Sequence, residues 1–138
     1  MIIKVSILSF SYRRGIPEDP TGNGGGFVFD CRAMPNPFWE EPLRYNTGCD
    51  RPIADFFARF PEKVEPFLHA TETLVLQTID EFRTSARNHI QVAFGCTGGQ
   101  HRSVYFAERL AQILRTVKDV DVEVRHTAEL YWETNAKE

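Results

Sequence analysis

The segment with the most chemical information runs from Ile90 to Ser103, where an apolar stretch gives way to two glycines and then to polar side chains. The apolar half predicts a buried strand, and the following residues predict a helix because apolar side chains recur at helical spacing. Main-chain N–H groups in a glycine-rich loop and in the first turn of a helix have no internal partner, and the helix dipole adds positive potential there. The segment therefore predicts a binding site for phosphate, sulfate or carboxylate.

The polar residues of this segment are the first candidates for contact with such an anion. Arg102 could add a bidentate contact, and His101 could donate a hydrogen bond beside it. The predicted ligand-binding residues here are Thr97, Gly98, Gly99, Gln100, His101, Arg102 and Ser103. The alternative is an ordinary strand-to-helix turn in which glycine only permits a positive φ.

The spacing of Cys96 and Arg102 also allows an enzymatic interpretation. Cys96-x5-Arg102 followed by Ser103 fits the loop of protein tyrosine phosphatases, where a thiolate attacks phosphorus while loop amides and the arginine hold the oxygens. Gly95 stands where that signature has histidine, and no Trp-Pro-Asp segment offers a general acid. A small buried residue that ends a strand is the commoner role for such a cysteine.

Composition indicates one globular domain over residues 1–138, with a core at 2–128 and a polar tail at 129–138. The net charge of −3 provides no overall basic field that would attract nucleic acid or membrane. No apolar run approaches the length of a membrane span, and the first residues enter a strand pattern rather than a signal peptide. We therefore expect a cytoplasmic protein that does not contact membranes.

The cysteines are odd in number and lack metal-ligand spacing, and the histidines form no paired ligand pattern with them. We therefore expect free thiols, no bound metal and no cofactor. The cysteines are Cys31, Cys49 and Cys96.

The elements that must position these residues follow from hydrophobic periodicity. Strands are predicted at residues 2–12, 27–31, 90–95 and 120–124, and helices at residues 52–60, 61–85 and 102–117. Ile3, Val5 and Ile7 are assigned to one face of the first strand, with Phe10 grouped with them. Asp50 is the expected cap of the first helix. The tail should fray or add a helical turn.

Strands joined through long helices predict an α/β domain with a mainly parallel or mixed sheet of about four strands, flanked by helices. Ligands bind beyond the carboxyl ends of such strands, which adds Asp30, Arg32, Arg14 and His126 to the candidate ligand-binding residues. Asp30 could accept hydrogen bonds from sugar hydroxyls, or could form an ion pair with Arg32 or Arg102 that shapes the loop.

Several stretches, in this order along the chain, resemble the C-terminal domain of the RNase adaptor RapZ and its relatives. They are Ser9–Pro17, Phe29–Trp39, Thr47–Asp50 and Gly95–Tyr105. The resemblance implies a pocket for an anion or phosphosugar, which in the family senses glucosamine-6-phosphate. In full-length relatives this domain also contacts small regulatory RNA, and an N-terminal domain carries a Walker-type nucleotide site. This sequence contains no G-x-x-x-x-G-K-[ST] pattern.

The expected function is therefore that of a non-catalytic domain that binds or senses a phosphorylated small metabolite such as glucosamine-6-phosphate. The expected partner is that metabolite or an inorganic anion, and the resemblance adds RNA; a homo-oligomer is a further option. Departures from the family pattern are the glycine-rich insertion at residues 22–26, Phe38 where relatives often have histidine, and Thr127 at a commonly basic position.

Overall fold

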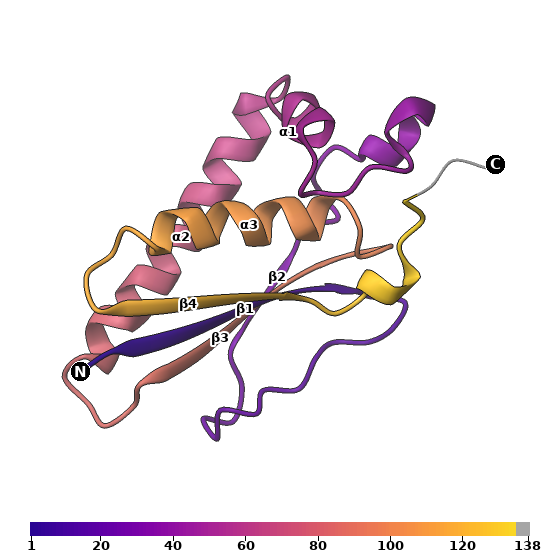
Figure 1. Cartoon of the computed structure of the whole chain (residues 1–138). Coiled ribbons are helices and arrows are strands. Elements are labelled where there is room, and N and C mark those ends of the chain that lie inside the picture. Colours follow the sequence, from indigo (N-terminus) through magenta and orange to yellow (C-terminus); the bar gives the residue numbers. More distant parts are fainter. Residues whose placement is uncertain (135–138) are drawn as a thin grey trace.

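The protein, described here over residues 1–134 in a computed structural model, is built on a four-stranded sheet in the order β2-β3-β1-β4. Each neighbouring pair of strands is parallel, so all carboxyl ends lie at one end of the sheet, on the right in Figure 1. The sequence prediction of an α/β fold with about four strands is confirmed. The strands are β1 (Ile3–Ser11), β2 (Phe27–Asp30), β3 (His89–Cys96) and β4 (Val120–His126).

The helices pack on one face of this sheet, while residues 12–26 run along the opposite face (Figure 1). They are α1 (Arg51–Phe57), α2 (Pro61–Phe82) and α3 (Arg102–Leu114), with short 3-10 turns η1 (Pro37–Trp39), η2 (Glu41–Leu43) and η3 (Glu129–Tyr131). The polar tail thus begins with a helical turn, and residues 135–138 lie outside the described residues. None of the described helices is both long and apolar enough to cross a bilayer.

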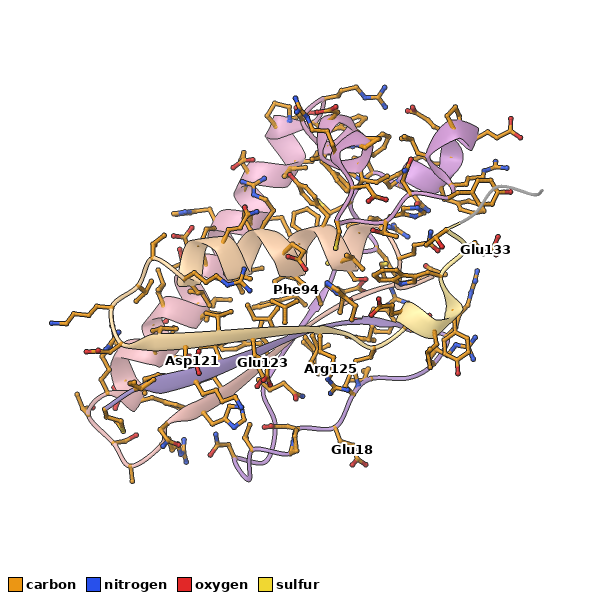
Figure 2. All side chains as sticks on the ribbon, viewed as in Figure 1. Glu18, Phe94, Asp121, Glu123, Arg125 and Glu133 are labelled. Atoms are coloured by element: carbon orange, nitrogen blue, oxygen red, sulfur yellow. The ribbon has the colours of Figure 1, made fainter. Side chains whose placement is uncertain are left out.

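The main core lies between the sheet and the helices because alternate residues of each strand point to that side. Ile3, Val5 and Ile7 are fully buried there, as predicted, and Figure 2 shows Phe94 of β3 on the same side. Phe10 was wrongly grouped with them: an even-numbered residue of β1 points to the other face, where Phe10 packs with Leu8, Ala93 and Tyr12.

The predicted helices extend too far at their carboxyl ends, for one shared reason. The first amide after each of α1, α2 and α3 still bonds four residues back, but the two amides that follow bond three residues back, as in Phe60 N to Phe57 O (3.0 Å) and Val117 N to Leu114 O (3.0 Å). Such bonds tighten a last turn into 3-10 geometry, which apolar periodicity does not distinguish from an α-helix. Asp50 does precede α1, but its carboxylate accepts from Thr47 N (2.8 Å) and does not cap the helix.

Candidate functional site

A cavity of about 220 Å³ lies at the carboxyl end of the sheet, and we call it the rim cavity. Its walls come from the loop after β3, the start of α3, the loop after β1, the segment around η1 and η2, and the chain after η3. The lining residues are Arg13, Asn36, Phe38, Arg44, Cys96, Thr97, Gly98, Gln100, His101, Arg102, Tyr131 and Glu133. Figure 2 shows Glu133 beside this end of the sheet.

The loop of residues 97–101, here called the glycine loop, is held in place by its carbonyl groups. Thr97 O accepts from Ser11 Oγ (2.6 Å), Gly99 O from Trp132 Nε1 (2.8 Å), and Gln100 O from Gly48 N (2.9 Å). In contrast, the main-chain amides of residues 97–102 have no acceptor among the described residues. The loop is therefore fixed with its donors unused, which is the arrangement that an anion site needs.

Two glycines of the loop have different roles. Gly99 has a φ of +70°, and a Cβ there would lie 2.8 Å from Ala128 Cβ and 2.9 Å from Ser11 N. A Cβ on Gly98 would meet nothing within 4 Å, and the φ of Gly98 is outside the left-handed range. The backbone thus requires glycine at residue 99, whereas Gly98 leaves open space at the cavity wall.

His101 lies at the start of α3 and is only 6 % exposed. Its Nε2 is buried without a hydrogen-bond partner among residues 1–134, although His101 lines the rim cavity. Burial lowers the pKa of this imidazole, and main-chain carbonyls of the 43–46 segment partly oppose that effect. The lowered pKa favours the uncharged imidazole, which has one N–H donor and one acceptor nitrogen.

Arg102 is buried, with 7 % exposure, and part of its guanidinium serves the fold. Nη1 donates to Arg32 O (2.8 Å) and Met34 O (3.3 Å), which fixes the turn after β2. Within the described chain, Nε and Nη2 have no hydrogen-bond partner, and Arg102 lines the cavity. The positive charge of Arg102 therefore lies at the cavity, as the sequence predicts, while one of its nitrogens, Nη1, is already bonded to main-chain carbonyls.

Gln100 and Ser103 support the loop through their side chains. Gln100 Nε2 donates to the carbonyls of Arg44 (3.2 Å), Asn46 (2.9 Å) and Glu133 (3.0 Å). Ser103 is fully buried, and its Oγ lies 3.1 Å from Cys96 Sγ. Both side chains are therefore bonded within the protein. For Gln100, only the main-chain amide remains as a donor toward the cavity.

Asp30 and Arg32 form a pair with each other. Arg32 Nη2 lies 2.7 Å from Asp30 Oδ2, and its Nε lies 2.9 Å from Oδ1. The hydrogen bonds from Arg32 hold the pKa of Asp30 below its ordinary value. The Arg32 guanidinium also stacks on Tyr12, 3.8 Å from the ring centre. Neither residue lines the rim cavity, so the ion-pair interpretation of Asp30 matches this geometry.

The remaining candidates, Arg14 and His126, also lie outside the cavity lining. The Arg14 guanidinium sits 3.3 Å from the centre of the Tyr131 ring. His126 bonds through Nδ1 to Ser9 Oγ (2.6 Å) and through Nε2 to Glu108 Oε2 (2.7 Å). The structure thus places His126 with a different set of side chains.

Two cavity cations were not among the predicted ligand-binding residues. Arg13 is exposed at the cavity, and its guanidinium forms no ion pair with another residue of the described chain. Arg44 donates from Nε to Phe38 O (2.8 Å). Adjacency to Arg14 was a usable signal for Arg13. No local pattern marks Arg44, because only the tertiary fold brings η2 to the glycine loop.

Comparison with known proteins finds a family match over most of the chain. The family described as the RapZ C-terminal domain matches residues 3–129. A nucleotide-binding protein of Pseudomonas fluorescens SBW25 is 43 % identical over 119 residues, which cover 86 % of this chain and 39 % of the relative. A nucleotide-binding protein of Alkalilimnicola ehrlichii is 45 % identical over 118 residues, covering 86 % and 38 %. One from Psychrobacter is 40 % identical over 132 residues, covering 94 % and 40 %. The chain thus spans about two fifths of these relatives.

Proposed function

The chain belongs to the RapZ C-terminal domain family, and on that premise we propose that it binds a phosphorylated small metabolite in the rim cavity without catalysing a reaction. This proposal depends on the glycine loop: the carbonyls of Thr97, Gly99 and Gln100 accept hydrogen bonds from protein groups, while the amides of residues 97–102 have no acceptor among the described residues. A phosphate group offers several acceptor oxygens and negative charge, which would satisfy those donors.

Charge around the cavity supports the same ligand. Arg13, Arg44 and Arg102 all line it, although the chain as a whole carries a net charge of −3. The neutral His101 adds an N–H donor from a buried position. Phosphate would therefore bind to a preformed set of donors and cations. A partner in contact with the neighbouring segments would then sense whether the ligand is bound.

We assign the remainder of the ligand to an amino sugar, with glucosamine-6-phosphate as the first candidate. This step rests on the family resemblance and on two further residues of the cavity lining. Asn36 and Glu133 line the cavity, and their side-chain oxygen atoms suit hydroxyl and ammonium groups. Phe38 adds an aromatic ring to the cavity lining, so one sugar contact would be apolar here.

The test is a thermal-shift series with glucosamine-6-phosphate, glucosamine, glucose-6-phosphate, inorganic phosphate and nucleotides. Nucleotides are included because the relatives carry the name nucleotide-binding protein, although those chains are much longer. A ligand that binds the folded state raises the melting temperature by mass action. We expect phosphosugar to raise it and glucosamine to leave it unchanged.

A matched pair of variants at Gly98 locates the ligand. Because a Cβ at Gly98 meets nothing within 4 Å, Gly98→Asp and Gly98→Asn should both fold. The carboxylate should weaken phosphate binding about tenfold through charge repulsion, whereas the neutral amide of similar size should change it much less. Equal affinities for the two variants would place the phosphate elsewhere.

A phosphatase is the second candidate function, favoured by the position of Cys96. This thiol lines the cavity, and its Sγ lies 3.1 Å from Ser103 Oγ and 3.4 Å from Ser103 N, two groups that could stabilise a thiolate. The test is turnover of p-nitrophenyl phosphate by the parent protein and by Cys96→Ser. Turnover that Cys96→Ser abolishes would establish the enzyme; a parent protein without turnover would exclude it for this substrate.

A further inference from the structure

A second group of side chains converges away from the rim cavity lining. Cys49 precedes α1, Glu108 lies on α3, and His126 ends β4. Glu108 Oε2 lies 2.7 Å from His126 Nε2 and 3.8 Å from Cys49 Sγ, and Sγ lies 3.9 Å from Nε2. These atoms, all within 4.8 Å of one another, are a thiol sulfur, a carboxylate oxygen and an imidazole nitrogen. Each is an established ligand type for Zn²⁺.

We propose that Cys49, Glu108 and His126 form a three-ligand site for Zn²⁺, with the fourth coordination position open to solvent. The sequence did not predict this site, because the three residues are far apart along the chain and form no local motif. The fold brings them together where β4 ends beside α3.

The spacing of the donor atoms suits tetrahedral coordination. Zinc bonds of about 2.3 Å to sulfur and about 2.0–2.1 Å to nitrogen and oxygen put the ligand atoms about 3.4–3.6 Å apart. The two distances from Cys49 Sγ, 3.8 and 3.9 Å, are within a few tenths of that value. The Glu108–His126 contact at 2.7 Å must open, which a rotation of the Glu108 side chain provides.

The histidine is oriented as a metal ligand would be. Its Nδ1 lies 2.6 Å from Ser9 Oγ, and Ser9 is its register partner on the neighbouring strand β1. A partner on Nδ1 fixes the ring and directs Nε2 toward the metal position, as outer hydrogen bonds do in zinc sites. The His126 side chain is 11 % exposed, so the ring is held by packing as well.

The charge of the cluster and its access to solvent also suit Zn²⁺. A thiolate, a carboxylate and a neutral imidazole carry a total charge that a divalent cation cancels, and a thiolate favours Zn²⁺ over Mg²⁺ or Ca²⁺. A surface cavity of about 360 Å³, lined by Cys49 and Glu108, gives solvent a path to the cluster. Arg109, which also lines it, donates to Tyr105 Oη (2.6 Å) and lies 3.8 Å from Glu65 Oε2, so its charge has a partner outside the site.

The experiment uses Co²⁺ as a spectroscopic substitute for Zn²⁺, with the full chain. The wild-type protein should bind one Co²⁺ and show a thiolate-to-cobalt charge-transfer band, and added Zn²⁺ should abolish the band. Cys49→Ser should remove the band and weaken Zn²⁺ binding at least about tenfold. His69→Ala, which removes an exposed histidine of α2, should behave like the wild type.

Folding is monitored separately, by the melting temperature and circular dichroism without metal. Cys49→Ser should melt close to the wild type in the presence of a chelator, while Zn²⁺ should raise the melting temperature of the wild type only. A cobalt band that persists in Cys49→Ser, or a wild type that gives no band and no Zn²⁺-dependent shift, would overturn the proposal. Failure of phosphosugar binding would leave these readouts unaffected, since the two sites share no side chain.

Discussion

Gly99 combines a left-handed φ of +70° with close neighbours, and the two effects should add on substitution. Gly99→Ala would strain the backbone and press a Cβ against Ser11 and Ala128, so we expect it to lower the free energy of unfolding by about 1–3 kcal/mol. Gly98→Ala, in open space one residue earlier, should change it by less than about 0.5 kcal/mol. Urea denaturation of both variants measures the difference, and similar losses would contradict this reading of the loop.

His101 should make stability depend on pH. Because burial lowers its pKa in the folded state, the unfolded chain takes up a proton near the ordinary value of 6.5 while the folded protein resists it. The stabilisation is thus complete above that pH and is lost as the pH falls through the lower folded pKa. We expect the wild type to lose more stability between pH 7.5 and pH 5 than His101→Gln, which cannot titrate there.

Denaturant unfolding at several pH values provides the measurement. Added phosphosugar should reduce the acid loss of the wild type, since a neighbouring anion favours the charged imidazole and raises its pKa. Identical pH profiles for the wild type and His101→Gln would show that the ring is not held neutral by the fold.

Gln100 connects three segments: the glycine loop, the loop after η2, and the chain after η3. Its amide nitrogen donates to Arg44 O, Asn46 O and Glu133 O, and its Oε1 accepts from Glu133 N (3.0 Å). Gln100→Ala should release the C-terminal segment, at a cost of about 1–3 kcal/mol for the unpaired carbonyls.

Trp132 reports on that release, because its indole donates to Gly99 O (2.8 Å) in the same segment. In a Trp39→Phe background, which removes a tryptophan that is 74 % exposed, Gln100→Ala should shift the remaining emission to longer wavelength. Emission unchanged from that of the background protein would mean that the segment is held by other contacts.

The strands and the glycine loop could be predicted because local sequence controls them. Strand alternation identified the buried face of β1 through Ile7, and Gly98-Gly99 identified the loop before α3. The interaction partners of the side chains at the strand ends could not be predicted in the same way. Asp30 has a partner two residues away in Arg32, whereas the Glu108 partner of His126 is distant along the chain.

The sheet has helices on one face only, although parallel sheets are usually covered on both. Residues 12–26 cover part of the other face: Gln91 Nε2 donates to Glu18 O (2.9 Å), and Asn23 Nδ2 to His89 O (2.7 Å). Toward the amino ends of the strands that face is polar, with Lys4 Nζ 3.7 Å from Glu123 Oε2. A loop and charged groups thus replace a second helical layer. Figure 2 shows Glu18 on the loop and Glu123 on the polar part of the sheet face.

The attachment of residues 12–26 to the sheet can be tested by limited proteolysis after Glu18. Gln91→Leu keeps the buried volume but removes the hydrogen bond to the Glu18 carbonyl. We expect a Glu-specific protease to cleave there several-fold faster than in the wild type, because local opening exposes the peptide bond. An unchanged cleavage rate would show that the other contacts of the segment suffice.

The anchoring of the glycine loop by its carbonyls also bears on how fast a ligand is captured. Since the loop is ordered through Ser11, Trp132 and Gly48 before any anion arrives, binding requires no slow rearrangement of the backbone. Association should follow a single exponential whose rate rises linearly with ligand concentration, and differences between related anions should reside in their dissociation rates.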